Sequence, residues 1–314
     1  MEVQPQLAPL LRSSGDLLAD RRYAFAMSLA ARGDAPAAID VLAQAVEIAP
    51  NFSSAWFALG ELRERTGDYP GAIRAYRCAQ STDPDDSHGA NLRLVRLGAE
   101  QPGAMPTGYI RSLFDQYAPG FEAALGGLGY CGPELLLTAI TTYCAQRRER
   151  LHFGKVLDLG CGTGLAGAAV RPLCKRLVGV DLAEAMVAQA RRKGVYDQLV
   201  IADIATFLAA ERVAAARYQL IPAADVLPYL YELTPFAAAA ASLLDAGALL
   251  CLTAETHPGE GIVLGESLRY SHGEAHVRDA IAAAGLTLEV LERAAKRRES
   301  GIPVATLVII ARRP

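Results

Sequence analysis

One stretch of the chain combines residue types that could hold a cofactor. It is Val156-Leu157-Asp158-Leu159-Gly160-Cys161-Gly162-Thr163-Gly164, an apolar run with one acid that leads into alternating glycines. The apolar part predicts a buried strand, and the glycines predict a tight turn into a helix. Because glycine has no Cβ, the backbone there can approach a ligand closely, and N–H groups at the helix start can face it. The stretch is therefore a candidate cofactor loop.

Two kinds of cofactor fit the glycines, and Asp158 distinguishes between them. Residues 162–167 also match the dinucleotide pattern G-x-G-x-x-G, and Asp181 follows at about the spacing of its ribose-binding acid. A pyrophosphate bound at this loop would lie close to Asp158, however, and the two anions would repel each other. An ammonium group would be attracted instead. The residues favour a cofactor with an amino group, with a dinucleotide-dependent dehydrogenase and a loop that has lost its ligand as alternatives.

The loop resembles the nucleotide-loop motif of class I S-adenosylmethionine-dependent methyltransferases. The cofactor of that family carries a methionine amino group and no phosphate, which agrees with an acid at position 158. The resemblance implies that the chain is an enzyme of this type and binds S-adenosyl-L-methionine. The first residues implied to bind it are Asp158, Gly160, Gly162 and Gly164.

Acids also end the next two expected strands, Arg176–Asp181 and Leu199–Asp203. The carboxylate of Asp181 could accept hydrogen bonds from both hydroxyls of a ribose, and it could cap the following helix as well. The resemblance implies that Asp203 takes the adenine amino group while the Ile204 N–H meets a ring nitrogen, although Asp203 could also be only a helix cap. The remaining residues expected at the cofactor are Tyr109, Tyr117, Leu182 and Ala224.

From Lys155 onward, expected strands and helices alternate, which predicts a mostly parallel sheet with its site at the carboxyl ends of the strands. Pro222 is awkward in the fourth strand because it removes a hydrogen-bond donor from the ladder. The fold class is an α/β Rossmann-like methyltransferase domain with seven strands, the last one antiparallel, preceded by an all-α repeat domain. The later strands are expected at Tyr218–Leu227, Ala248–Thr253, Leu286–Leu291 and Pro303–Ile310.

An internal repeat occupies the N-terminal part. The pair Gly33-Asp34 recurs as Gly67-Asp68 after about 34 residues, the period of the tetratricopeptide helix pair, which the second copy resembles closely. Pro50 and Pro84 end the two units because proline cannot continue a helix. We expect His88–Leu97 to form a third half-repeat that caps the stack. Such repeats bind peptides in some proteins and only pack on a neighbouring domain in others.

These features divide the chain into three parts: a tetratricopeptide-repeat domain at 1–100, a linker with lid helices at 101–150, and the methyltransferase domain at 151–314. The linker is placed at Gln101–Thr107 by its prolines and glycine. The segment Phe114-Asp115-Gln116-Tyr117-Ala118 resembles the Phe-Asp-x-Tyr-Ala-like lid of small-molecule methyltransferases, where a tyrosine face near the sulfonium could add a cation–π attraction. The alternative is an ordinary amphipathic helix packed on the sheet.

The acceptor site is expected at the exit of the fourth strand and in the polar connection between Glu255 and Val277. The run at 224–227 differs from the Asn-Pro-Pro-Tyr of methyltransferases that act on planar amide or nucleobase nitrogens, which argues against those substrates. His272 is the candidate catalytic base, because imidazole takes a proton near neutral pH, and a solvated loop residue is the alternative. The pocket candidates are Asp225, Tyr229, Tyr231, Arg269 and Tyr270.

Composition excludes several other classes. A net charge of −3 with 52% hydrophobic and 21% charged residues is typical of a globular protein, and basic clusters such as Lys296-Arg297-Arg298 are expected to be solvated surface, so nucleic acid is not implied. The six cysteines form no C-x-x-C pair or metal spacing, which indicates free thiols in a reducing cytoplasm. No apolar run reaches the ~18 residues that a membrane span needs, and from residues 1–18, which carry acids and prolines, we expect no targeting segment.

Taken together, the residues and the resemblance predict a cytoplasmic enzyme that transfers the sulfonium methyl group to a small-molecule acceptor. The attacking O, N or C nucleophile stays open. One alternative is a protein methyltransferase whose substrate the repeats recruit, and another is a non-catalytic repeat scaffold.

Overall fold

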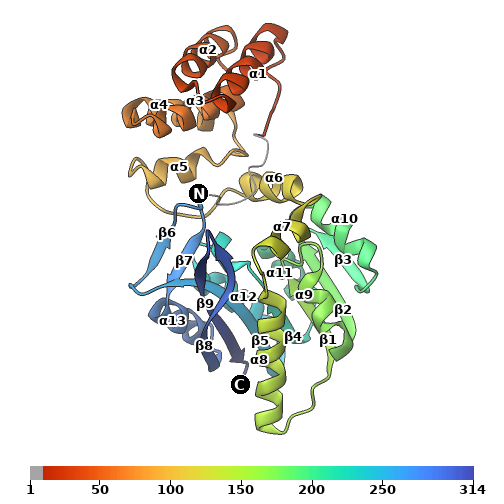
Figure 1. Ribbon diagram of the computed structural model, residues 1–314. Coiled ribbons are helices and arrows are strands. Elements are labelled where there is room, and N and C mark those ends of the chain that lie inside the picture. Colours follow the sequence, from red (N-terminus) through yellow and green to blue (C-terminus); the bar gives the residue numbers. More distant parts are fainter. Residues whose placement is uncertain (1–9) are drawn as a thin grey trace. The chain divides into compact units, whose positions relative to one another are not determined.

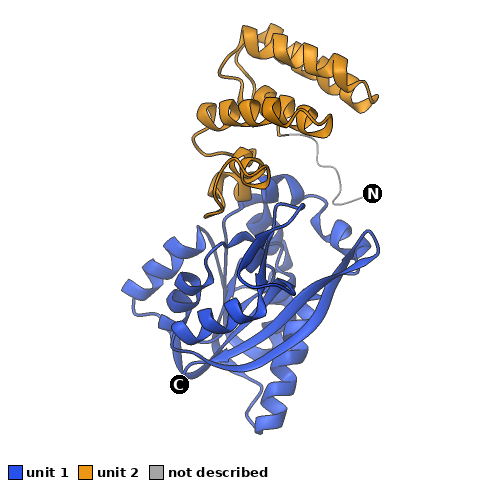
Figure 2. Ribbon diagram, turned by 90° about the vertical axis from the view of Figure 1, so that its left-hand side faces the viewer, with its two compact units in different colours: residues 1–6, 113–314 blue, residues 7–112 orange. Residues whose placement is uncertain are grey.

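The computed structural model describes residues 10–314, and these fall into two compact units (Figure 2). One unit ends at Ser112, and the other runs from Leu113 to Pro314. The boundary lies inside helix α6 (Thr107–Tyr117), whereas the sequence places the linker before it, at Gln101–Thr107. The lid segment that begins at Phe114 thus folds with the second unit.

The first unit is a stack of helix pairs (Figure 1). The turn before the second helix of each pair explains the repeated Gly-Asp: Gly33 and Gly67 adopt left-handed conformations with φ of 86° and 83°, and Asp34 and Asp68 cap the helix that follows. The last helix packs on the fourth through a buried apolar cluster, as expected for a capping half-repeat. The helices are α1 (Leu17–Ala31), α2 (Ala35–Ile48), α3 (Ser53–Arg65), α4 (Tyr69–Thr82) and α5 (Ala90–Arg96).

The second unit is built on a mostly parallel sheet whose main part has the strand order β3-β2-β1-β4-β5-β9-β8. Strands β1 to β5 are parallel, and β9 runs antiparallel between β5 and β8, as the sequence predicts. All seven strands therefore exist where they are expected; several are longer, whereas β3 ends at Ile201 and β4 at Ala223, earlier than expected. They are β1 (Phe153–Leu159), β2 (Cys174–Asp181), β3 (Gln198–Ile201), β4 (Tyr218–Ala223), β5 (Leu244–His257), β8 (Thr287–Glu299) and β9 (Ile302–Arg312).

The connection between Glu255 and Val277, expected to be a polar loop, contains two further strands. β5 continues to His257, and its end pairs in parallel with β7 (Tyr270–Gly273), which pairs antiparallel with β6 (Ile262–Leu264). The physical reason is that β5 extends beyond its ladder with β9, which stops at Glu255, and so offers two more residues for pairing. Residues in this connection are therefore held by a ladder.

Pro222 lies inside β4, opposite Cys251 of β5. On the other side of β4, the pairing with β1 is limited to Val156 and Leu220, which agrees with the donor that proline lacks. The chain then leaves the sheet at Ala223, so the proline stands one residue before the exit that leads to the expected acceptor site.

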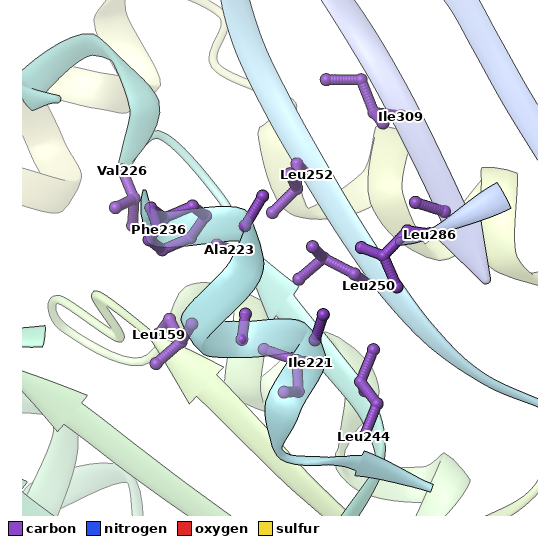
Figure 3. Close-up of a cluster of buried hydrophobic side chains, with 14 of the residues drawn as sticks. Leu159, Ile221, Ala223, Val226, Phe236, Leu244, Leu250, Leu252, Leu286 and Ile309 are labelled. Carbon is purple, nitrogen blue, oxygen red and sulfur yellow. The ribbon is translucent and has the colours of Figure 1, made fainter. Parts of the chain in front are cut away.

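Helices cover both faces of this sheet (Figure 1). One face carries a large apolar core of strand residues packed with α11, α12 and α13, part of which is drawn in Figure 3. The other face packs against α8 and α9. Burial on both faces explains the nearly continuous apolar strands. The remaining elements are α7 (Phe121–Gly127), α8 (Gly132–Arg147), α9 (Leu165–Val170), η1 (Arg171–Leu173), α10 (Glu184–Lys193), α11 (Ile204–Val213), η2 (Leu227–Tyr229), α12 (Leu233–Ser242) and α13 (Glu274–Ala283).

No single helix within residues 10–314 is long and apolar enough to cross a membrane. Helices α7 and α8 together reach the required length and composition, but they are bent by 75° at the break between them. All six cysteines are free thiols.

Candidate functional site

The glycine loop joins β1 to α9 at the carboxyl edge of the sheet. Gly160, Gly162 and Gly164 have φ of 64°, 53° and 90°, a left-handed region that side chains rarely adopt. A Cβ on Gly160 would lie only 2.4 Å from Cγ2 of Val226. A Cβ on Gly162 would have no described atom within 4 Å. The loop is therefore packed on one side and open at its middle glycine, where a ligand can approach the backbone.

Asp158 is completely buried beneath this loop. Its Oδ2 accepts a hydrogen bond of 2.7 Å from the Tyr196 hydroxyl, while Oδ1 has no hydrogen-bond partner within residues 10–314. The pKa of Asp158 is raised to about 7, mainly by burial and also by the charge of Asp181, while the Tyr196 hydroxyl and the nearby Gly167 backbone act to lower it. A buried, half-paired carboxylate is costly, and a cationic ligand group would relieve that cost.

Tyr196 is a site residue that the sequence analysis missed. It lies between α10 and β3, and its ring packs against backbone where glycines leave room. A Cβ on Gly167 would lie 2.0 Å from its hydroxyl, and a Cβ on Gly179 would lie 2.7 Å from its ring. The only signal in the sequence was the presence of Gly167 and Gly179 inside a helix and a strand, where no turn requires glycine. Nothing local to position 196 indicates a role.

Asp181 ends β2 and ties the glycine loop to the next turn. Its Oδ2 accepts a hydrogen bond from the N–H of Gly162, and its Oδ1 accepts one from the N–H of Ala183, both at 2.9 Å. Burial raises the pKa of Asp181, and the hydrogen bonds from Ala183, Gly162 and Leu182 lower it. Asp181 therefore fixes the turn at Leu182 and Ala183, but it does not cap α10, whose N-cap is Ala183 and has no side-chain cap hydrogen bond. Ribose binding by Asp181 stays a prediction, since each carboxylate oxygen can accept a second bond.

Asp203 follows β3 and caps α11, since its Oδ1 accepts a hydrogen bond of 3.1 Å from the N–H of Thr206. Ile204 begins that helix, and its Cδ1 would lie 3.9 Å from a Cβ on Gly160. The carboxyl ends of three neighbouring strands thus bring the glycine loop, Asp181 and Asp203 to one edge. The adenine contacts of Asp203 and Ile204 stay predictions.

The lid segment rests on the same edge. Asp115 Oδ1 accepts a hydrogen bond of 2.9 Å from the N–H of Ala185 in the first turn of α10. Ala118, Ala183 and Met186 form a buried cluster with aromatic residues of α6 and α7. The ring of Phe114 then meets the ring of Tyr229 edge-on at 5.1 Å. The segment therefore bridges the chain after β2 and the chain after β4.

The two tyrosines expected at the cofactor lie in different units. Tyr117 belongs to the lid, packs on the cluster described above, and has a pKa raised by burial. Tyr109 belongs to the repeat unit, where its ring lies against Gly89. Its cofactor role stays a prediction.

Comparison with known families agrees with this geometry. Residues 156–247 match the model of a methyltransferase domain, and residues 29–94 match that of a tetratricopeptide repeat. The chain carries an S-adenosylmethionine-dependent methyltransferase domain. Its cofactor is S-adenosylmethionine. No curated protein matches the chain.

Two solved structures share the fold of the methyltransferase domain at low sequence identity. Magnesium protoporphyrin IX methyltransferase from Synechocystis is 18% identical, with a TM-score of 0.51 over 68% of this chain and 100% of that one. The 1,6-didemethyltoxoflavin-N1-methyltransferase from Burkholderia thailandensis is also 18% identical, with a TM-score of 0.50 over 68% of this chain and 92% of that one.

The residues of the methyltransferase domain fit the cofactor, which supplies an electrophilic methyl group on a sulfonium when bound. The unpaired Oδ1 of Asp158 lies beneath the loop without exposed surface, so in this conformation its charge would attract the amino group through the loop, while the open face of Gly162 leaves room for the ligand itself. Asp181 keeps acceptor capacity for hydroxyl groups beside that loop. Asp158, Gly162 and Asp181 are the residues that would hold it.

A buried charge cluster lies where β4 and β5 end. It comprises three acids and three bases, and Glu255 Oε1 accepts from Arg269 Nε at 3.1 Å and from Arg297 Nη2 at 2.5 Å. Lys296 is completely buried, binds Asp225, and has a pKa lowered well below its usual range by burial and by Arg297. The members of the cluster are Asp225, Glu255, Arg269, Lys296, Arg297 and Glu299.

This cluster corrects the expectation that Lys296 and Arg297 are solvated; of that basic run, only Arg298 is exposed. A β-bulge between Ala295 and Arg298 lets two consecutive side chains point inward. The bulged backbone is satisfied by the α7–α8 connection, since the carbonyl of Lys296 accepts a hydrogen bond of 2.8 Å from the N–H of Cys131. Strand alternation alone would have placed one of the two outside.

The predicted pocket residues divide between the cluster and its surroundings. Asp225 and Arg269 belong to the charge cluster, and Tyr229 lies against Phe114 of the lid. Asp225 has a left-handed φ of 60°, and its N–H donates to Thr253 Oγ1 at 3.0 Å. Ala224, just before it, is half-buried. Tyr270 is buried in β7, with its ring 5.4 Å from that of Tyr231.

His272 is completely buried in β7. Its Nε2 lies 3.2 Å from the carbonyl of Leu227, its ring stacks on His276 at 5.6 Å, and burial lowers its pKa to about 4. It is therefore neutral at pH 7 and bonded to backbone. A base has to reach the proton it removes, and a ring without exposed surface does not do so in this conformation. The catalytic role of His272 stays a prediction, and its contacts describe a structural one.

Proposed function

We propose that the chain is a cytoplasmic enzyme that methylates a small, flat, ring-containing molecule. The observation that carries this proposal is the lid of the methyltransferase domain. Asp115 anchors it on α10, and Phe114 reaches Tyr229 after β4, so an aromatic roof spans from the cofactor edge to the acceptor edge. A roofed site encloses a small acceptor and excludes water from the reacting atoms.

The charge cluster at the ends of β4 and β5 favours a neutral acceptor. The three acids and three bases of the charge cluster pair with one another, which leaves no surplus charge to be matched by a ligand. Aromatic side chains such as Phe114 and Tyr229 favour stacking against a flat ring. The two similar solved structures are named for acceptors that contain flat rings, a protoporphyrin and a didemethyltoxoflavin.

Methyl transfer is an in-line displacement at carbon, so the domain can act mainly by orientation. Holding the nucleophile within ~3–3.5 Å of the methyl carbon supplies much of the rate enhancement. In this proposal the lid holds the acceptor, and Asp225, two residues after the end of β4, keeps acceptor capacity beside its ion pair with Lys296 and can orient a hydroxyl or amine. A separate base is needed only if the nucleophile carries a proton at neutral pH.

A protein acceptor is the second candidate, because residues 29–94 are tetratricopeptide repeats, a module that binds protein partners. In that case the repeats would recruit the substrate, and the methyltransferase domain would modify a side chain of it.

Labelling distinguishes the two candidates. A cell lysate is incubated with the purified chain and methyl-labelled S-adenosylmethionine, and the label is then measured in the small-molecule and protein fractions. We expect label in the small-molecule fraction, and much less with Asp181→Ala, the matched control for cofactor-dependent transfer. Label in the protein fraction alone would overturn the proposal and support the repeat-recruited substrate.

A further inference from the structure

The repeat unit holds a short extended segment of its own chain. Residues Leu10, Leu11 and Arg12 precede α1 without regular structure and cross the start of α3 and the α4–α5 connection. The Ser54 hydroxyl accepts a hydrogen bond of 2.9 Å from the N–H of Arg12 and donates one of 3.3 Å to its carbonyl. His88 Nε2 lies 3.2 Å from the carbonyl of Leu10. Backbone groups of an extended peptide are therefore bound directly.

The side chain of Arg12 is bound at two points. Its Nη1 donates to Asp83 Oδ1 at 3.0 Å, and its Nη2 donates to Ser87 Oγ at 2.6 Å. The second oxygen of Asp83 accepts from the N–H of Ser87 at 2.8 Å, which fixes the carboxylate. A planar guanidinium fits two acceptors held apart in this way, whereas the single ammonium of lysine does not span them equally well.

The groups that bind the segment are far more buried than the side chain that they bind. Ser54, Asp83 and Ser87 are 1%, 3% and 3% exposed, while the Arg12 side chain is 47% exposed. The Arg12 guanidinium supplies the cation that this buried carboxylate needs, and the His88 ring lies on the other side of the carboxylate, with Nδ1 3.4 Å from Asp83 Oδ2. The start of α3 and the α4–α5 connection thus present the acceptors, and the arginine lies on them with half of its side chain exposed.

We propose that Ser54, Asp83, Ser87 and His88 form a recognition site for an extended, arginine-containing peptide. In this chain, Leu10–Arg12 occupies that site in cis. Hydrogen bonds from Ser14 to Asp20 hold the segment beside it, which gives the cis arginine a high effective concentration. A partner protein that carries the same kind of segment binds the repeats by displacing it.

The test uses the full chain and a fluorescent peptide of residues 7–15, measured by anisotropy. The Arg12→Ala chain should bind the peptide about tenfold or more tightly than the unsubstituted chain, because the cis competitor is weakened. The same peptide with lysine in place of arginine should bind about tenfold more weakly than the arginine peptide. Ser87→Ala added to Arg12→Ala should also weaken binding while leaving the carboxylate in place.

Circular dichroism of each variant shows whether the helices are retained. If the Arg12→Ala chain loses helix, the Arg12→Lys chain replaces it, because it keeps the charge next to Asp83 while giving up the contact with Ser87. Equal peptide affinity for the unsubstituted chain and for the folded Arg12→Ala chain, or the Arg12→Lys chain that replaces it, would overturn the proposal. So would equal affinity for the arginine and lysine peptides.

Discussion

The hydroxyl of Tyr196 donates a hydrogen bond of 2.7 Å to Oδ2 of Asp158, and the other oxygen of that buried carboxylate is left without a partner within the described residues. This pair sets the electrostatics of the cofactor loop. Tyr196 supports the charged form of Asp158, burial opposes it, and the balance places the pKa of Asp158 at about 7.

The first prediction is a pH dependence of cofactor binding. An amino group in its ammonium form binds the ionised Asp158, so affinity should rise as pH increases through about 7. It should fall again as the ammonium loses its proton, near the usual α-amino pKa of about 8. Calorimetric titrations between pH 6 and 9 measure this profile. Asp158→Asn should remove the rising limb, and an unchanged rising limb in that variant would contradict the assignment.

The same carboxylate makes a prediction for the free protein. The folded pKa of Asp158 lies above the unfolded value, so this group opposes folding more strongly as pH rises from about 4 to about 7. The Asp158→Asn variant lacks this penalty. Its gain in the free energy of unfolding over the unsubstituted chain should therefore be larger at pH 8 than at pH 4. Urea denaturation of both proteins at the two pH values measures the difference, and Tyr196→Phe should change it in the opposite direction.

Two glycines of the loop should respond differently to alanine. At Gly160, the Cβ would meet Val226 and φ is positive, so Gly160→Ala should lower the free energy of unfolding by about 2–4 kcal/mol. At Gly162, only the positive φ opposes the change, and the loss should be about 1–2 kcal/mol. Cofactor affinity should fall for Gly162→Ala, since its methyl group would project into open space at the loop. Equal loss of stability in both variants would contradict the packing described.

Lys296 supplies a further prediction. Lys296→Met leaves Asp225 and Glu255 with one fewer buried cation, and should lower the free energy of unfolding by about 3–5 kcal/mol. Arg298→Met is the matched control, because the side chain of Arg298 is exposed. The free energy of unfolding should change by no more than about 0.5 kcal/mol in that variant. Denaturant titration measures both. Equal effects would mean that Lys296 is solvated, as its sequence context suggested.

A prediction on His272 separates its structural role from a catalytic one. The folded pKa of about 4 lies below the ordinary value of 6.5, so neutral His272 contributes stability above pH 6.5 that is lost as pH falls toward 4. His272→Ala should lower the melting temperature at pH 7.5 and reduce the loss on acidification. Turnover per folded molecule should stay within about tenfold. A fall of about 10²–10⁴ in turnover with unchanged stability would instead establish His272 as the base.

Local sequence patterns predict much of the fold. Apolar runs identify β1 to β3, with one acid inside the first run and acids at the ends of the other two. The Gly-Asp turns identify the helix pairs, and the glycines at 160, 162 and 164 identify the cofactor loop. These features depend on neighbours in the sequence, so their interpretation needs no knowledge of tertiary structure.

The remaining features depend on long-range contacts. Tyr196 acquires its role only because Gly167 and Gly179, distant in the sequence, leave room for its ring, as does Gly164 of the cofactor loop. Lys296 and Arg297 are buried because a bulge and the α7–α8 connection turn them inward. β7 forms because β5 extends past β9, which no periodicity in the polar connection indicates. The sequence therefore predicts a loop at His272, whereas the residue lies in the ladder between β5 and β7.

The most direct test of the account is calorimetric titration of the chain with S-adenosylmethionine and, separately, with NAD. The account predicts one site for S-adenosylmethionine and no binding heat from NAD, because Asp158 would repel a pyrophosphate. Asp181→Ala should weaken the cofactor by roughly 2–4 kcal/mol through loss of an ionised acceptor. Micromolar binding of NAD with no response to S-adenosylmethionine would contradict the account at its centre.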